Sequence, residues 1–81
     1  MTIHALFFGH YRDTVPSGEL TISLPDSATV ADAAAALATT ELRLADLLSR
    51  TRVAVGADFA TAETLLKDGD ELAFLPPMSG G

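Results

Sequence analysis

Cysteine is absent from the 81-residue sequence, and so is any long apolar run. The first absence excludes a disulfide-stapled secreted scaffold, a thiolate zinc site and a cysteine nucleophile. The second leaves no segment long enough to span a bilayer, and the first eleven residues lack the basic start and apolar stretch of a secretory signal. We therefore expect a soluble protein of the cytoplasm with no membrane partner.

Positive charge is scarce. Five Lys and Arg residues stand against eleven Asp and Glu residues, which gives a formal net charge of -6. Such a chain repels phosphate backbones and anionic lipid, so we expect no nucleic-acid partner and favour protein partners with basic faces. The length allows a single domain, and 48% apolar residues with 20% charged residues are enough to form a folded core.

Two segments near the start alternate in the manner of half-buried β-strands. The first covers residues 3–8 and stops at Gly9, and the second covers residues 19–24. Between them we expect one short helical turn around residues 11–14. Because a parallel crossover needs a dozen or more residues, the two strands are predicted to pair as an antiparallel hairpin.

A helix is predicted over residues 30–38, because Thr29 and Asp32 have the spacing of a capping box before a run of alanines. The leucine-rich residues 41–48 that follow fit either a further short helix or a packed loop. Thr39 and Thr40 lower the helix propensity between these two segments.

Two further strands are predicted at residues 52–55 and 71–75. Between them Leu65 and Leu66 are both expected to be buried, and the charged turn before the last strand places Gly69 at a positive φ. This order of elements indicates an α+β fold with a mixed sheet and one main helix packed on one face. In a β-grasp (ubiquitin-like) arrangement the first and last strands lie parallel at the sheet centre. We expect a domain over residues 1–75 and an extended tail over residues 76–81.

No catalytic or metal-binding constellation is visible. His4 and His10 are six residues apart without further ligands nearby, and the acidic residues around Gly69 lack a twelve-residue calcium loop. Ser79 has no base near it in sequence. We therefore expect no metal site and no catalytic side chain.

The C-terminal segment is the most unusual feature. It has no charged side chain, two prolines stiffen its start, and two glycines leave its tip without side chains. Six residues reach at most about 20 Å, enough to enter a partner's active site. A frayed, inert terminus is the alternative. The residues concerned are Pro76, Pro77, Met78, Ser79, Gly80 and Gly81.

The polar residues of the first and last strands mark the outward face of the sheet. By strand alternation Leu6 and Phe8 share that face, and so do Ala73 and Leu75. Neighbouring strands then expose an apolar patch, which is typical of a partner-binding surface. Arg12 and acidic residues are expected to form its polar rim.

Over nearly its whole length the sequence resembles the MoaD/ThiS family of ubiquitin-like sulfur carriers. The Pro-Pro pair shortly before the Gly-Gly end is similar to the molybdopterin branch. One departure is Gly56, where the family usually places Asn, and it affects the expectation for the local turn alone. The matching segments are Leu6-Phe7-Phe8-Gly9, Tyr11-Arg12-Asp13, Thr29-Val30, residues 66–72 and residues 74–81.

The resemblance implies a sulfur carrier with no bound cofactor. An ATP-dependent activating enzyme adenylates the carboxylate of Gly81, and a sulfur donor protein converts the acyl adenylate to a thiocarboxylate. The large subunit of molybdopterin synthase then accepts the tail, and sulfur passes to cyclic pyranopterin monophosphate. In this scheme the chain is a sulfur-donating co-substrate that supplies no acid or base.

Three alternatives remain open from the sequence. The chain could be a related carrier for thiazole, tRNA or cysteine sulfuration. It could be a ubiquitin-like protein modifier in which Gly81 forms an isopeptide bond with a target lysine. It could also be a plain binding domain with an inert tail.

Overall fold

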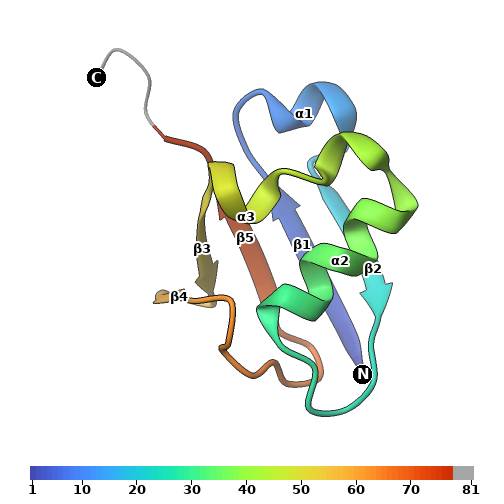
Figure 1. Ribbon diagram of the computed structural model, residues 1–81, viewed down its shortest axis with the longest axis vertical. Helices are drawn as coiled ribbons and strands as arrows, with labels where there is room; N and C mark the ends of the chain where they lie inside the picture. The colour runs from blue at the N-terminus through green and yellow to red at the C-terminus, as the bar shows by residue number, and fades with distance from the viewer. Residues whose placement is uncertain (78–81) are drawn as a thin grey trace.

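A five-stranded sheet forms the centre of the computed structural model, which describes residues 1–77 (Figure 1). The strand order is β2-β1-β5-β3-β4, with β1 and β5 parallel and all other neighbours antiparallel. This mixed sheet with a parallel pair of first and last strands confirms the predicted α+β, β-grasp architecture. The strands are β1 (Thr2–Phe7), β2 (Glu19–Ser23), β3 (Arg52–Val55), β4 (Asp58–Ala60) and β5 (Glu71–Leu75).

The helices cover one face of this sheet, and α2 (Val30–Thr40) is the main one (Figure 1). The predicted capping box is present: the amide of Thr29 donates to Oδ2 of Asp32 (2.9 Å), and the amide of Asp32 donates to Oγ1 of Thr29 (3.3 Å). The helix ends two residues later than predicted. The hydroxyls of Thr39 and Thr40 donate to carbonyl oxygens one turn back, which lets both residues continue the helix.

The ambiguous leucine-rich segment combines both predicted alternatives. It contains a short 3-10 turn, η1 (Leu42–Leu44), and the one-turn helix α3 (Leu47–Arg50). Leu44 and Leu47 are buried, whereas Leu42 is 81% exposed. The predicted turn between β1 and β2 is also present, as α1 (Tyr11–Thr14).

The turn before β5 is built as its residue types predict. The Oδ1 of Asp68 accepts from the amide of Thr2 (2.7 Å), the Oδ2 of Asp70 accepts from the amide of Lys67 (2.8 Å), and Gly69 has φ +86°. Gly56 has φ +62°, a conformation that glycine and asparagine both tolerate. The departure from the family pattern is therefore conservative for the backbone.

One expectation about the region after β3 was wrong, and one strand in that region was not predicted. Leu66 is buried as predicted, but Leu65 is 62% exposed, because successive residues of an extended segment point in opposite directions. The amide of Leu66 bonds to the carbonyl of Ala28, which fixes this orientation. Strand β4 was not predicted, since Phe59 is its one large apolar residue.

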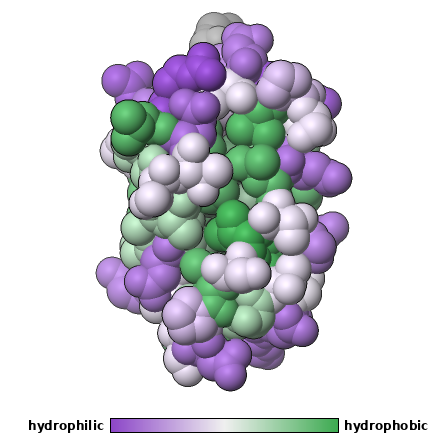
Figure 2. Space-filling model, turned by 90° about the vertical axis from the view of Figure 1, so that its right-hand side faces the viewer, coloured by the Kyte–Doolittle hydropathy of each residue, from purple (hydrophilic) through white to green (hydrophobic). Residues whose placement is uncertain are grey.

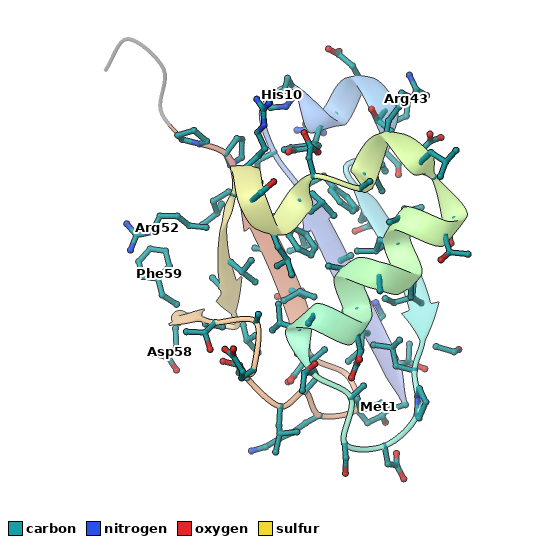
Figure 3. The ribbon with its side chains drawn as sticks, in the orientation of Figure 1. Met1, His10, Arg43, Arg52, Asp58 and Phe59 are labelled. Atoms are coloured by element: carbon teal, nitrogen blue, oxygen red, sulfur yellow. The ribbon has the colours of Figure 1, made fainter. Side chains whose placement is uncertain are left out.

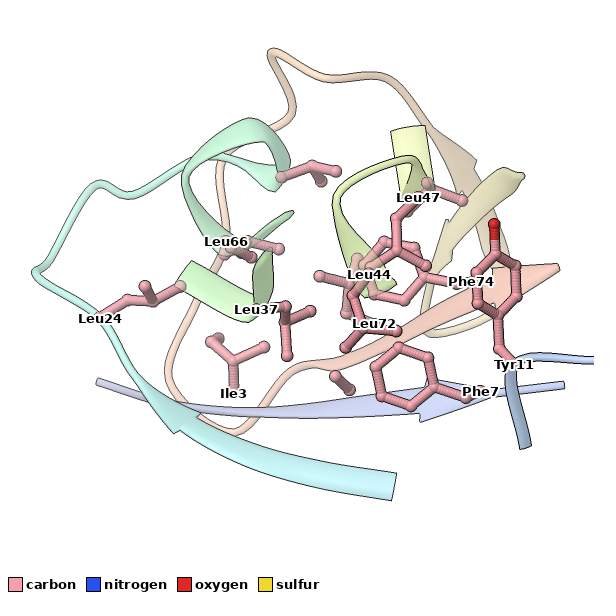
Figure 4. Packing of buried hydrophobic residues seen from close by; sticks show 14 of the residues in the cluster. Ile3, Phe7, Tyr11, Leu24, Leu37, Leu44, Leu47, Leu66, Leu72 and Phe74 are labelled. Atoms are coloured by element: carbon pink, nitrogen blue, oxygen red, sulfur yellow. The ribbon is translucent and has the colours of Figure 1, made fainter. Parts of the chain in front are cut away.

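The core lies between the sheet and the helices (Figure 4). Phe7 and Phe74 are neighbours across the β1–β5 ladder, and their rings stack with centroids 5.6 Å apart. Ile3, Leu37 and Leu72 are completely buried near them. Burying one such side chain contributes about 1.5–3 kcal/mol, so this face of β1 and β5 is the main source of stability.

The side of the molecule that carries β2 and α2 shows apolar surface between more polar margins (Figure 2). Leu20 and Ile22 of β2 are partly buried and pack against the core at this edge. Within residues 1–77, no helix is both long and apolar enough to cross a bilayer.

Candidate functional site

The tail leaves the sheet at a fixed point, which we call the tail root and define as Gly9, Pro76 and Pro77. Pro76 is half-buried and follows directly on β5. A Cβ atom at position 9 would lie 2.7 Å from Cγ of Pro76, and Gly9 has φ +63°. No other residue fits there without movement or backbone strain, so the backbone of Gly9 forms the seat of the Pro76 ring.

Helix α1 holds Gly9 in place. The carbonyl of Gly9 accepts from the amide of Arg12 (3.1 Å), and the next residue but one, Tyr11, is buried. The hydroxyl of Tyr11 donates to Oδ1 of Asp46 (3.2 Å), which ties α1 to the segment between η1 and α3. Burial raises the pKa of Tyr11, the charge of Asp46 and this hydrogen bond raise it further, and Arg50 opposes them.

Four residues of the predicted tail, Met78, Ser79, Gly80 and Gly81, lie outside the described residues. Their predicted insertion into a partner and the predicted role of the Gly81 carboxylate stay predictions. The division into a domain over residues 1–75 and a tail over residues 76–81 stays a prediction as well. What the structure gives is the position and direction from which the tail starts.

The sheet face opposite the helices carries the predicted apolar residues, and we call it the open face. Leu6 pairs with Ala73 across the β1–β5 ladder, and Leu75 is opposite Arg52 on β3. Leu6, Ala73 and Leu75 are half-buried, and Phe8, just beyond β1, is 41% exposed. The predicted parity of both strands is therefore correct.

Phe59 extends the open face and was missed by the sequence reasoning. It lies on β4 opposite Ala54, which is in turn opposite Ala73, and it is 64% exposed. The guanidinium carbon of Arg52 is 4.3 Å from the centroid of its ring (Figure 3). A single aromatic residue in an alanine-rich segment was the one signal available in the sequence.

Arg12 lies beside the connection between β1 and β2 rather than across the strands. A Cβ atom at Gly18 would lie 3.2 Å from its Nη2, so the guanidinium rests against the Gly18 backbone. Gly18 itself accepts the amide hydrogen of Phe7 at the end of β1. This places Arg12 at the same end of the sheet as Phe8 and the tail root, where a rim residue is expected.

The charges are distributed unevenly along the molecule. Residues 63–71 hold four of the eleven acidic residues and the one lysine of the chain, and this segment leads into the end of β5 remote from Pro76. A basic partner surface is attracted to this segment. The four acidic residues are Glu63, Asp68, Asp70 and Glu71.

The two histidines are not brought together. His4 lies on β1 with its Nδ1 3.4 Å from Oγ1 of Thr21, and the ring of His10 packs on Tyr11 with centroids 4.2 Å apart (Figure 3). In the part of the chain that the structure describes, no group of three or more His, Asp or Glu side chains could hold a metal ion. The arrangement can present a tail and an apolar surface to another protein.

Comparison with known proteins places the chain in a family. The ThiS family model matches residues 5–81. The molybdopterin synthase sulfur carrier subunit of Chlamydomonas reinhardtii is 31% identical over 83 aligned positions, covering all of both chains. The subunit of the same name from Mycobacterium tuberculosis is 33% identical and covers 98% of this chain and 96% of the relative.

Solved structures agree on the fold. SAMP1 from Haloferax volcanii superimposes with a TM-score of 0.89 at 25% identity, over the whole of both chains. A chain in the complex of subunits 1 and 2 of the molybdopterin-converting factor of Helicobacter pylori gives a TM-score of 0.72 at 24% identity, again over the whole of both chains. The β-grasp sheet, the seated Pro76 and the match over residues 5–81 lead to one conclusion: this chain belongs to the ThiS family.

Proposed function

We propose that this chain is the sulfur carrier subunit of a molybdopterin synthase. Its family membership supports a sulfur carrier, and the two curated relatives above carry this name over their full length. These relatives favour the molybdopterin pathway over carriers for thiazole, tRNA or cysteine sulfuration. The cytoplasm is the proposed compartment, because it supplies ATP and reduced sulfur donors.

The observation that carries the proposal is the tail root. The ring of Pro76 rests on the Gly9 backbone at the end of β5, and no side chain fits between them. A carrier must deliver its terminal carbonyl at a fixed depth in another protein, so the start of its tail has to be fixed relative to the docking surface. Gly9 belongs to the segment that anchors α1, and Pro76 adjoins Leu75 of the open face.

The chemical steps then take place at the carboxylate of Gly81, and other proteins catalyse them. An activating enzyme joins the Gly81 carboxylate to the α-phosphate of ATP, which releases pyrophosphate. Hydrosulfide released by a sulfur donor protein attacks the acyl carbon, displaces AMP and leaves a thiocarboxylate. Transfer of that sulfur to cyclic pyranopterin monophosphate, with water supplying oxygen, restores the carboxylate.

The partner that accepts the tail is proposed to be the large subunit of the synthase, bound through the open face. Leu6, Phe8, Phe59 and Leu75 provide the apolar contacts, with Arg12 at the margin. The Helicobacter pylori structure contains a complex of subunits 1 and 2, which supports a two-subunit assembly. In that assembly this chain binds no cofactor, and ATP is consumed by the activating enzyme.

The proposal is tested by intact mass. The full chain is incubated with a molybdopterin-pathway activating enzyme, ATP and a sulfide source, and its mass should increase by the difference between one sulfur and one oxygen atom. Omission of ATP is the control and should leave the mass unchanged. Covalent ladders on other proteins in place of this exchange would support a protein modifier, and an unchanged mass would support the inert-tail reading.

A further inference from the structure

A cavity of about 240 Å³ opens at the β3–β4 edge of the sheet. Its lining is part apolar and part polar. In the apolar part, Leu48 comes from α3, Val53 from β3, Phe59 and Ala60 from β4, and Ala62 from the loop that follows. Sites for cofactors and drug-sized ligands usually measure about 300–1,000 Å³. This cavity is therefore of a size for one large side chain rather than a nucleotide.

Among the polar residues that line the cavity, the guanidinium of Arg52 is the charged group available to a ligand. The hydroxyl of Thr51 donates to the carbonyl of Leu47, and Thr61 is engaged with Thr64 through its amide. Arg52 also lines the cavity, and the Phe59 ring beneath its guanidinium restrains it (Figure 3). A guanidinium offers five N–H donors and prefers a carboxylate.

Arg52 differs from the other arginines near it. Arg43 is paired with Glu41 (3.3 Å) and Arg50 with Asp46 (3.7 Å). Arg52 forms no ion pair with any residue between 1 and 77. Asp58 and Glu63 adjoin the lining residues Phe59 and Ala62 in the sequence, but neither forms an ion pair with Arg52.

We propose that this cavity binds a peptide segment of a partner protein in which an apolar side chain adjoins a carboxylate. The apolar side chain fills the space beside Leu48 and Ala62, and the carboxylate accepts hydrogen bonds from Arg52. The cavity takes no part in the chemistry at Gly81, although one of its lining residues, Phe59, also belongs to the open face that is proposed to bind the large subunit. If the cavity binds no such segment, the intact-mass result expected for the proposed function is unaffected.

N-acetyl-leucine carries both required groups and serves as the probe. It is titrated into the ¹⁵N-labelled full chain, and backbone amide shifts are followed by NMR. We expect saturable shifts at Leu48, Thr51 and Ala62, with affinity about tenfold lower for N-acetyl-leucinamide, which lacks the charge. Arg52→Gln should lower the affinity for N-acetyl-leucine about tenfold, to that of the amide.

Arg50→Gln is the matched control, because Arg50 is a neighbouring arginine that does not line the cavity, and it should bind as the unmodified chain does. The spectrum of each variant reports whether it is folded. The proposal is overturned if acetate shifts the same amides with equal affinity, which indicates a bare anion site. It is also overturned if acid and amide bind equally, if no shift saturates, or if the shifts follow protein concentration instead of probe concentration.

Discussion

The two faces of the central strands have the same backbone and opposite roles. On the helix side of β1 and β5, Phe7 and Phe74 are almost completely buried and stack on each other. On the open side, Leu6 and Ala73 are paired in the same ladder but remain half-exposed. Alternation along two short strands therefore separates residues that hold the fold together from residues available to a partner.

The largest effect on stability is expected on the helix side. Phe74→Ala should lower the free energy of unfolding by about 3–5 kcal/mol, because it removes a stacked ring from the core and leaves a cavity. Urea unfolding followed by circular dichroism measures this. Phe59→Ala, which truncates an exposed ring of the open face, is the control and should cost about 1 kcal/mol or less. Equal losses would mean that the two faces do not differ in this way.

On the open side the expected effect is on binding. Leu75→Glu should weaken association with the large synthase subunit by about 2 kcal/mol or more, because a charge would be buried without a partner in an apolar contact. Isothermal titration calorimetry measures the affinity. Leu42→Glu, at an exposed position on the helix side, should change nothing. Unfolding of the Leu75 variant would contradict the assignment of the faces.

Gly9 lies at the tail root, beneath the ring of Pro76. Comparison with a second glycine, Gly56, isolates the effect of this contact. Gly9→Ala and Gly56→Ala should each cost about 1–2 kcal/mol of stability from the left-handed backbone, and the Gly9 variant should lose more because its Cβ would lie 2.7 Å from Cγ of Pro76. The new Cβ contacts Pro76 in the first variant and nothing within 4 Å in the second. Sulfur transfer should therefore fall in the Gly9 variant alone. Equal transfer by both variants would remove the tail root from the account.

The smallest predicted effect concerns Tyr11, which anchors α1 beneath the tail root. Its pKa is raised above 10.0, so the folded chain keeps the phenol proton at a pH where the unfolded chain loses it. Stability should thus fall as the pH rises past about 10 and through the folded-state pKa. Tyr11→Phe should lack that part of the fall. Because the chain has a single tyrosine, phenolate absorbance reports its titration directly.

Local patterns accounted for most of the fold. The capping box at Thr29 and the alternation of β1, β2 and β5 are properties of adjacent residues, and all four features are present. Strand β4 has no such pattern, because its three residues are held by their pairing with β3. Leu65 was misassigned because apolar character alone does not say which side of an extended segment points inward.

The candidate site, like the fold, was predictable where local patterns determine it and not where distant residues meet. The alternation of side chains along β1 and β5 predicted the open face, because residues paired across the β1–β5 ladder point to the same side of the sheet. The contact between Gly9 and Pro76 joins opposite ends of the sequence, so no local pattern could predict it. Phe59 was missed for the same reason, because its place on the open face depends on the β3–β4 register.

Sulfur transfer by tail variants in a purified synthase tests the central claim most directly. The full chain, a chain lacking Gly81 and a chain with one residue added after Gly81 are each activated, mixed with the large subunit and assayed for molybdopterin. One residue moves the terminal carbonyl by about 3.5 Å, beyond the tolerance of reacting groups. Both variants should unfold at the same temperature as the full chain and form no product. Molybdopterin formation by the chain that lacks Gly81 would contradict the sulfur-carrier account.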